Sequence, residues 1–127
     1  MTGADQTAVR YARIALAAAF LCAVGSRLGL WGTWDGFEAW ARTDVLAFVP
    51  DAAVKPLLVA ATIAEASLGV LLLVGSWPRT VGLAAAALLA TFGLSMALSA
   101  GIRSPLEYSV FSASAAALLV ARMSPRS

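Results

Sequence analysis

The sequence contains no histidine and a single cysteine, Cys22, among its 127 residues. The lack of histidine excludes His-ligated haem, His-ligated metal and the Ser–His or Cys–His pairs of hydrolases. One cysteine allows no disulfide within the chain. The basic residues are scattered and form no run, which argues against a nucleic-acid partner. We therefore predict no catalytic residue and no metal ligand in this chain.

Charge is also scarce, and apolar residues take its place. Charged side chains make up 13% of the sequence and hydrophobic ones 61%, against roughly 25% and 45–50% in an average soluble domain. The mean hydropathy of +0.84 agrees with this bias, and the length suits a single domain. The sequence predicts an all-α, four-helix transmembrane bundle. We expect membrane spans at about residues 8–31, 56–75, 80–100 and 106–121, and an amphipathic surface segment at about residues 35–49.

The first span has a competing interpretation as a signal peptide. Two features favour a retained helix. The apolar stretch continues beyond Arg27, and no small-x-small cleavage motif precedes a soluble domain. The polar residues 1–7 are expected to precede this helix.

The segment 35–49 is the longest connection. Asp35 and Glu38 have the spacing of a capping box, and Phe37 and Trp40 recur at helical spacing. We expect one or two short amphipathic helices on the membrane surface. A loop with anchoring aromatic residues is the alternative.

One carboxylate, Glu65, lies near the middle of the second span. A charge at the centre of a membrane helix costs ~2.5–3.5 kcal/mol on insertion scales, so a partner has to offset it. Arg27 is the leading candidate, although its side chain could instead snorkel to the interface. A neutral, protonated Glu65 is a further alternative. The predicted binding residues are Glu65, Arg27, Thr62 and Ser95.

Small residues recur four positions apart along the spans. This spacing places them on one helix face, where a second helix can approach closely. The predicted packing residues are Ala61 and Gly69 around Glu65, Gly25 and Gly29 around Arg27, and Gly93, Ala97 and Gly101 in the third span. They indicate that Glu65 faces the interior of the bundle and not the lipid.

Basic residues are more frequent on one side of the predicted bundle. That side, which holds both termini, carries Arg10, Arg13, Arg79, Arg122 and Arg126, whereas the other carries Arg42, Lys55 and Arg103. The positive-inside rule then predicts two cytoplasmic termini, and we expect a bacterial inner membrane. The tryptophans fall at span ends or in connections, as in an aromatic belt: Trp31, Trp34, Trp40 and Trp77.

Residues 60–79, AATIAEASLGVLLLVGSWPR, resemble the signature of the DoxX family. There, a glutamate in the second span is followed by glycine, a leucine run, a second glycine and an arginine; Glu65, Gly69, Gly75 and Arg79 match this order. Arg27 stands where the family's Gly-x-Lys-Leu motif usually has lysine. Residues 105–111 also resemble a segment of some members. The resemblance implies a four-helix membrane bundle linked to redox complexes, such as thiosulfate–quinone oxidoreductase or an assembly with superoxide dismutase and a sulfurtransferase.

Three functions fit these features. The resemblance favours a non-catalytic accessory or anchor subunit of a quinone- or sulfur-linked membrane redox complex. Other redox proteins or a second copy would be its partners, and a quinone is a candidate ligand. A small proton-coupled transporter is the second hypothesis, but small multidrug exporters carry their glutamate in the first span. The third is a structural bundle in which Glu65 pairs with Arg27 only to specify packing.

Overall fold

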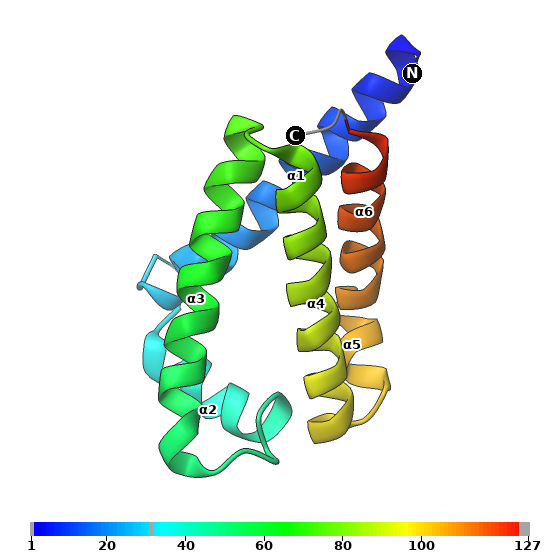
Figure 1. Ribbon diagram of the computed structural model, residues 1–127. Helices are drawn as coiled ribbons and strands as arrows, with labels where there is room; N and C mark the ends of the chain where they lie inside the picture. Colours follow the sequence, from blue (N-terminus) through cyan, green and yellow to red (C-terminus); the bar gives the residue numbers. More distant parts are fainter. Residues whose placement is uncertain (1, 31, 125–127) are drawn as a thin grey trace.

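The computed structural model describes residues 2–30 and 32–124. These residues form six helices and no strand: α1 (Gly3–Arg27), α2 (Trp34–Asp44), α3 (Asp51–Val74), α4 (Pro78–Ala100), α5 (Arg103–Glu107) and α6 (Val110–Met123) (Figure 1). α1, α3 and α4 are each long and apolar enough to cross a membrane, and α6 is a shorter apolar helix of 14 residues. The predicted all-α class and three long apolar spans are confirmed.

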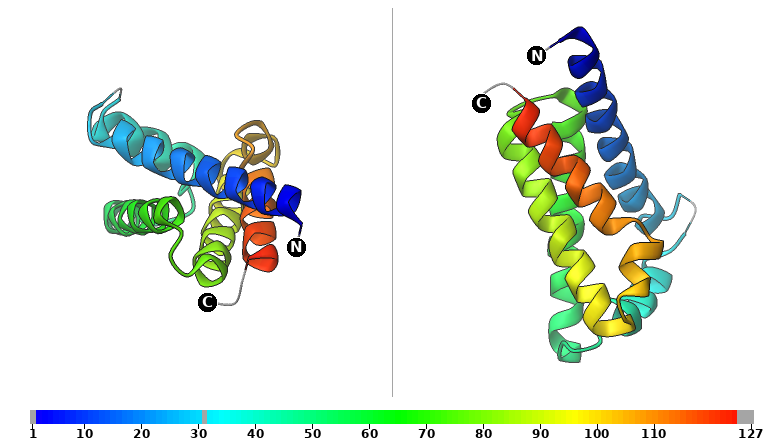
Figure 2. Two further views of the ribbon diagram at one scale, coloured as in Figure 1. Left: turned by 90° about the horizontal axis from the view of Figure 1, so that it is seen from above. Right: turned by 90° about the vertical axis from the view of Figure 1, so that its right-hand side faces the viewer.

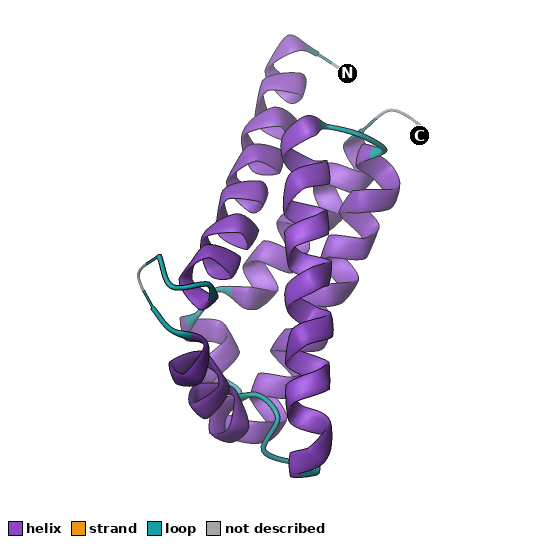
Figure 3. Cartoon of the chain, turned by 90° about the vertical axis from the view of Figure 1, so that its left-hand side faces the viewer, coloured by secondary structure: helices purple, strands orange, loops and turns teal. Residues whose placement is uncertain are grey.

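Four helices, α1, α3, α4 and α6, run in alternating directions along the molecule (Figure 1). The start of α1, the α3–α4 turn and the end of α6 lie at one end, and α2 and α5 lie at the other (Figure 2). α4 packs along α6, and α1 packs against both α3 and α6. The α3–α4 turn lies at one end of the molecule and the α2–α3 connection at the other, and most of the described chain is helical (Figure 3).

α1 begins and ends earlier than the predicted first span. Its start is a capping box, in which the Asp5 N–H donates to Thr2 Oγ1 over 3.1 Å and the Thr2 N–H donates to the Asp5 carboxylate over 3.2 Å. This cap draws the polar start of the chain into the helix. The helix ends at Arg27, four residues before the predicted end of the first span at residue 31, and Trp31 itself lies outside the described residues.

The surface segment holds one short helix followed by turns. Thr33, and not Asp35, caps α2, because the Thr33 hydroxyl accepts the Gly36 backbone N–H over 3.0 Å. Asp35 instead lies in the first turn, where a negative charge favours the helix dipole. Residues 45–49 form turns and bends that lead to α3.

The predicted fourth span at residues 106–121 is broken. α5 ends at Glu107, Ser109 adopts a left-handed conformation with φ 57°, and α6 begins at Val110. At 1.5 Å per residue, α6 is about 21 Å long and falls short of a hydrocarbon core of ~30 Å. Neither glycine nor proline marks the break at Ser109, so it could not be predicted from the residue types there.

Two of the predicted packing glycines lie at close helix contacts. A Cβ added to Gly69 of α3 would lie 2.9 Å from the Leu21 side chain of α1. A Cβ on Gly93 of α4 would overlap the Phe111 ring of α6. Since real Cβ atoms do not approach this closely, both helix pairs depend on glycine at these positions.

The other predicted packing residues differ in their placement. Gly25 is buried in α1, and Ala61 and Ala97 are partly buried. Gly29 and Gly101 lie beyond the ends of α1 and α4, with φ of 103° and 88°. They therefore terminate helices and do not lie on a packing face, contrary to the prediction, because a left-handed backbone suits glycine and ends the helix.

Arg13 holds α1 against the end of α3. Its Nη1 donates to the Leu72 carbonyl over 2.7 Å and more weakly to the Leu73 carbonyl over 3.4 Å. These carbonyls lie in the last turn of α3, where a cation is favourable. Gly75 follows with φ 85° and leaves the space that the guanidinium occupies.

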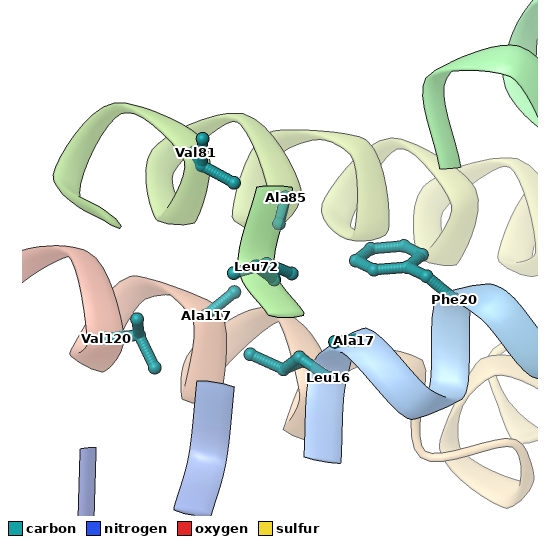
Figure 4. Packing of buried hydrophobic residues seen from close by; sticks show 8 residues of the cluster. All are labelled: Leu16, Ala17, Phe20, Leu72, Val81, Ala85, Ala117 and Val120. Atoms are coloured by element: carbon teal, nitrogen blue, oxygen red, sulfur yellow. The ribbon is translucent and has the colours of Figure 1, made fainter. Parts of the chain in front are cut away.

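Two apolar clusters hold the helices together. The larger one joins four helices through Leu16, Ala17 and Phe20 of α1, Leu72 of α3, Val81 and Ala85 of α4, and Ala117 and Val120 of α6 (Figure 4). The smaller one joins α2 and the turn after it to α3 and α4 through Ala41, Val45, Val54, Leu58 and Met96. Many other large apolar side chains point outwards, among them Leu73, Leu94 and Leu98. An apolar exterior of this kind is typical of helices that contact lipid.

Candidate functional site

Glu65 of α3 is the one charged residue that is buried among the described residues, with 3% of its surface exposed. It lies within the long apolar run of α3. An isolated buried carboxylate is unfavourable, since it loses its hydration and gains nothing in return. Glu65 therefore depends on the polar groups that surround it.

The partner of Glu65 is Arg27, the last residue of α1. Arg27 Nη1 lies 2.8 Å from Glu65 Oε1, and the two side chains are 10% and 4% exposed. The same Nη1 donates to Thr62 Oγ1 over 3.0 Å, while the Thr62 hydroxyl donates to the Leu58 carbonyl over 2.8 Å. Of the two orientations that the sequence leaves open for Arg27, the structure has the inward one.

An aromatic ring of α2 covers the guanidinium. The Arg27 Cζ lies 3.9 Å from the centroid of the Phe37 ring, within the range of a cation–π interaction. Three helices thus converge on one polar cluster: α1 supplies Arg27, α3 supplies Glu65 and Thr62, and α2 supplies Phe37. The carboxylate, the hydroxyl and the ring contact the guanidinium of Arg27 from different sides and together hold it in place.

Glu65 and Arg27 face a pocket between the helices, which we call the inner pocket. Its volume is about 190 Å³. Most of its wall is apolar and comes from α1, α3 and α4: Leu16, Phe20, Leu58, Leu89, Phe92 and Met96. The ion pair is therefore a polar anchor in an apolar cavity, the arrangement found in many small-molecule sites.

A row of aromatic side chains forms the wall of the inner pocket nearest α2. Phe37 and Trp40 have ring centroids 6.3 Å apart, and Trp40 meets Tyr108 edge to face with centroids 5.7 Å apart. All three line the pocket. Sequence reasoning treated Trp40 only as an interface anchor and missed its place in the wall. The helical spacing of Phe37 and Trp40 was the one available signal, since it puts both on the same face of α2.

Thr62 and Ser95, the other two predicted binding residues, differ in their placement. Thr62 contacts Arg27 directly, as described above. Ser95 is partly buried on α4 and is not part of the pocket lining. The rotation of α4 about its axis decides which of its faces meets the pocket, and here Phe92 and Met96 occupy that face.

The side chains in and around the inner pocket differ in the chemistry that they can supply. A guanidinium offers only N–H donors, so Arg27 supplies no base. Cys22 is exposed on the outside of α1 and lies outside the inner pocket lining. Within residues 2–30 and 32–124, no group of three or more Cys, Asp or Glu side chains is placed to hold a metal ion.

No family model, no curated protein and no solved structure matches this chain.

Proposed function

We propose that this chain is a DoxX-like integral membrane protein that serves as a non-catalytic accessory or anchor subunit of a membrane redox complex. In this role it binds a lipophilic headgroup of the quinone class in the inner pocket. The observation that carries the proposal is the buried Arg27–Glu65 pair at the edge of an apolar pocket of about 190 Å³. Charges inside a membrane span are costly and usually mark a functional site.

The hydrogen-bonding capacity of the pair supports a ligand. A guanidinium carries five N–H donors, and Arg27 uses both donors of Nη1 on Glu65 and Thr62. Its Nε and Nη2 donate to no acceptor among the described residues, and Glu65 Oε2 accepts no hydrogen bond from them. A quinone carbonyl fits the free donors, and the hydroxyl of a reduced quinone fits Oε2.

The size of the inner pocket supports a single ring. A cavity of roughly 150 Å³ in another protein binds benzene. The pocket here, at about 190 Å³, has room for one ring with small substituents. Phe20, Phe37 and Phe92 in its wall offer aromatic surface against which such a ring can pack.

The proposed membrane topology has four crossings and two cytoplasmic termini. α1, α3 and α4 supply three crossings, and α5 with α6 together supply the fourth. Arg10 in the first half of α1, Arg79 in the first turn of α4 and Arg122 in the last turn of α6 are exposed. The starts of α1 and α4 and the end of α6 lie at one end of the bundle (Figure 2), which supports placing that end in the cytoplasm. The apolar outer faces of the helices are then open to lipid, to other redox subunits or to a second copy.

The test is calorimetric titration of the purified, detergent-solubilised chain with duroquinone, a single-ring quinone. Hydrogen bonds to charged groups contribute about 1.5–3 kcal/mol, so Arg27→Met is expected to weaken binding by about tenfold to a hundredfold. Glu65→Gln, which leaves the guanidinium without its anion, is expected to weaken binding as well. The matched control is Glu107→Gln in the exposed Arg103–Glu107 pair, which should bind like the native chain.

Other outcomes would favour the other hypotheses. Equal titration curves for the native chain, Arg27→Met and Glu107→Gln would mean that duroquinone only partitions into detergent, and the pair would then be structural. Proton-linked flux through liposomes would favour a transporter. Reduction of duroquinone with thiosulfate by the isolated chain, lost in Glu65→Gln, would make the protein an enzyme.

A further inference from the structure

A second concavity adjoins the inner pocket at the α2 end of the bundle. This outer hollow is open to the surface and lies between the end of α1, the start of α2 and Tyr108, with Ser26, Thr33 and Gly36 in its wall. It shares five lining residues with the inner pocket: Ala23, Arg27, Phe37, Trp40 and Tyr108. These five residues therefore border both spaces.

From this arrangement we propose that the outer hollow is the entrance to the inner pocket, and that Trp40 and Tyr108 form the partition across it. The inference rests on the proposed ligand-binding function, which it deepens by naming the path and the orientation of the ligand. Ligands enter from the membrane surface on which α2 lies.

The side of the bundle between α3 and α4 offers no comparable path at this end. The two helices diverge towards α2 in Figure 1, but the smaller apolar cluster fills the space between them. Val45, Leu58 and Met96 of that cluster are 2%, 1% and 3% exposed. Opening this side would require α2 to lift off, whereas the entrance at Trp40 needs only the movement of side chains.

The polarity of the two spaces defines the class of ligand. The inner pocket has an apolar wall, whereas hydroxyls of Ser26 and Thr33 line the outer hollow. Arg27 lies at the boundary and keeps free N–H donors there. The fitting ligand is an amphiphile with its ring in the inner pocket and a hydrogen-bond acceptor at Arg27.

Tyr108 is placed to move at this entrance. It is 60% exposed and lies between α5 and α6, directly before Ser109 with its left-handed backbone. Trp40 is held on the opposite side by α2, whose Ala41 is fully buried. Because one wall is anchored and the other lies at a helix break, rotation of Tyr108 is sufficient to widen the entrance.

The test is thiol labelling of single-cysteine variants of the full chain in lipid vesicles, in a Cys22→Ser background. Ala113→Cys places a thiol in the inner pocket alone, Thr33→Cys in the outer hollow, and Leu94→Cys on the lipid-facing surface of α4. The reagent is the membrane-impermeant anion methanethiosulfonate ethylsulfonate, applied to each side of the vesicle separately. We expect Ala113→Cys to react only from the side on which Thr33→Cys reacts, and duroquinone to slow that reaction.

Widening the entrance should accelerate the reaction of Ala113→Cys. A minor open state is commonly ~0.1–10% populated. Trp40→Ala or Tyr108→Ala removes a wall side chain and leaves the entrance open in every molecule, so the labelling rate of Ala113→Cys should rise by about tenfold or more. Trp34→Ala is the matched control, since Trp34 also lies on α2 but lines neither space. Two wall variants are used so that misfolding of one leaves the other informative.

Two results would contradict the proposal that the outer hollow is the entrance to the inner pocket. One is an unchanged rate for Ala113→Cys in both wall variants, and the other is labelling of Ala113→Cys by lipid-soluble N-ethylmaleimide alone. If duroquinone still binds in these cases, the path is wrong and the proposed function stands. If the rates respond as expected but duroquinone neither binds nor protects, the entrance exists and the quinone proposal is wrong.

Discussion

Removing one member of the Arg27–Glu65 pair should destabilise the bundle far more than removing both. Arg27→Met leaves Glu65 in an apolar site without its partner at 2.8 Å. Breaking a buried pair in this way costs ~3–5 kcal/mol, whereas replacing both members by apolar residues of similar size is often neutral or stabilising. We therefore expect Arg27→Met to lose ~3–5 kcal/mol and the double variant Arg27→Met/Glu65→Leu to recover most of that loss.

Two weaker interactions of Arg27 add to this loss of stability. Arg27→Met also removes the hydrogen bond to Thr62 and the cation–π contact with Phe37. Neither returns in the double variant, so its recovery should fall short of the native stability by about 1–2 kcal/mol. The stability that the double variant does not recover therefore measures the contribution of the contacts around the ion pair, and the recovered part measures the contribution of the pair itself.

The assay is reversible unfolding in mixed micelles with increasing dodecyl sulfate, followed by circular dichroism. The matched control is the exposed pair Arg103–Glu107, with side chains 88% and 56% exposed and an N···O distance of 2.6 Å. Exposed pairs contribute about 0–1 kcal/mol, so Arg103→Met should be nearly silent. If Arg27→Met costs no more than Arg103→Met, the reasoning about a buried, structurally required pair is refuted.

Three further predictions concern the fold and its topology. Gly82→Ala should destabilise the protein by about 1–3 kcal/mol in the same unfolding assay, because the added Cβ would lie 2.9 Å from the Ala121 backbone nitrogen. The control is Gly3→Ala, whose added Cβ meets nothing within 4 Å. Equal stability of the two variants would contradict the close packing of α4 against α6. Gly75→Ala should cost about 1–2 kcal/mol for its left-handed backbone, and more for displacing Arg13, whereas Arg13→Gln alone would lose only the bonds to the end of α3. Fusions of alkaline phosphatase and of a fluorescent protein to the C-terminus should show fluorescence and no phosphatase activity, and the opposite pattern would reverse the proposed orientation.

Much of the fold follows from physical constraints that are visible in the sequence. In lipid, the backbone N–H and C=O groups of a long apolar run have no water to bond, and a helix pairs them within the run. Three long helices were therefore predictable. Arg27 and Glu65 were predictable as partners because each is expensive alone in a span and few other charges lie there. The boundaries were less accessible, since the Thr2–Asp5 cap and the early end of α1 depend on two or three local bonds.

The walls of the site were not predictable, because they depend on how α2 folds back onto the bundle. Phe37, Trp40 and Tyr108 look like interface anchors in the sequence, and only the tertiary packing turns them towards Arg27 and the pocket. Ser109 breaks the fourth span without a glycine or proline to mark it. Ser95 lies outside the lining of the inner pocket, and its hydroxyl group says nothing about the rotation of α4.

Solid-state NMR in lipid bilayers gives the sharpest test of a buried Arg27–Glu65 pair that binds a lipophilic ring. The measurement is the dipolar coupling between the ¹³C carboxyl of Glu65 and ¹⁵N of the arginine guanidinium, with Glu65→Gln used to assign the signal. We expect a measurable coupling, since the N···O distance is 2.8 Å, and a change in both chemical shifts when duroquinone is added. A Glu65 carboxyl signal without coupling to any guanidinium, or a coupled pair whose shifts ignore duroquinone while the ligand binds, would contradict it.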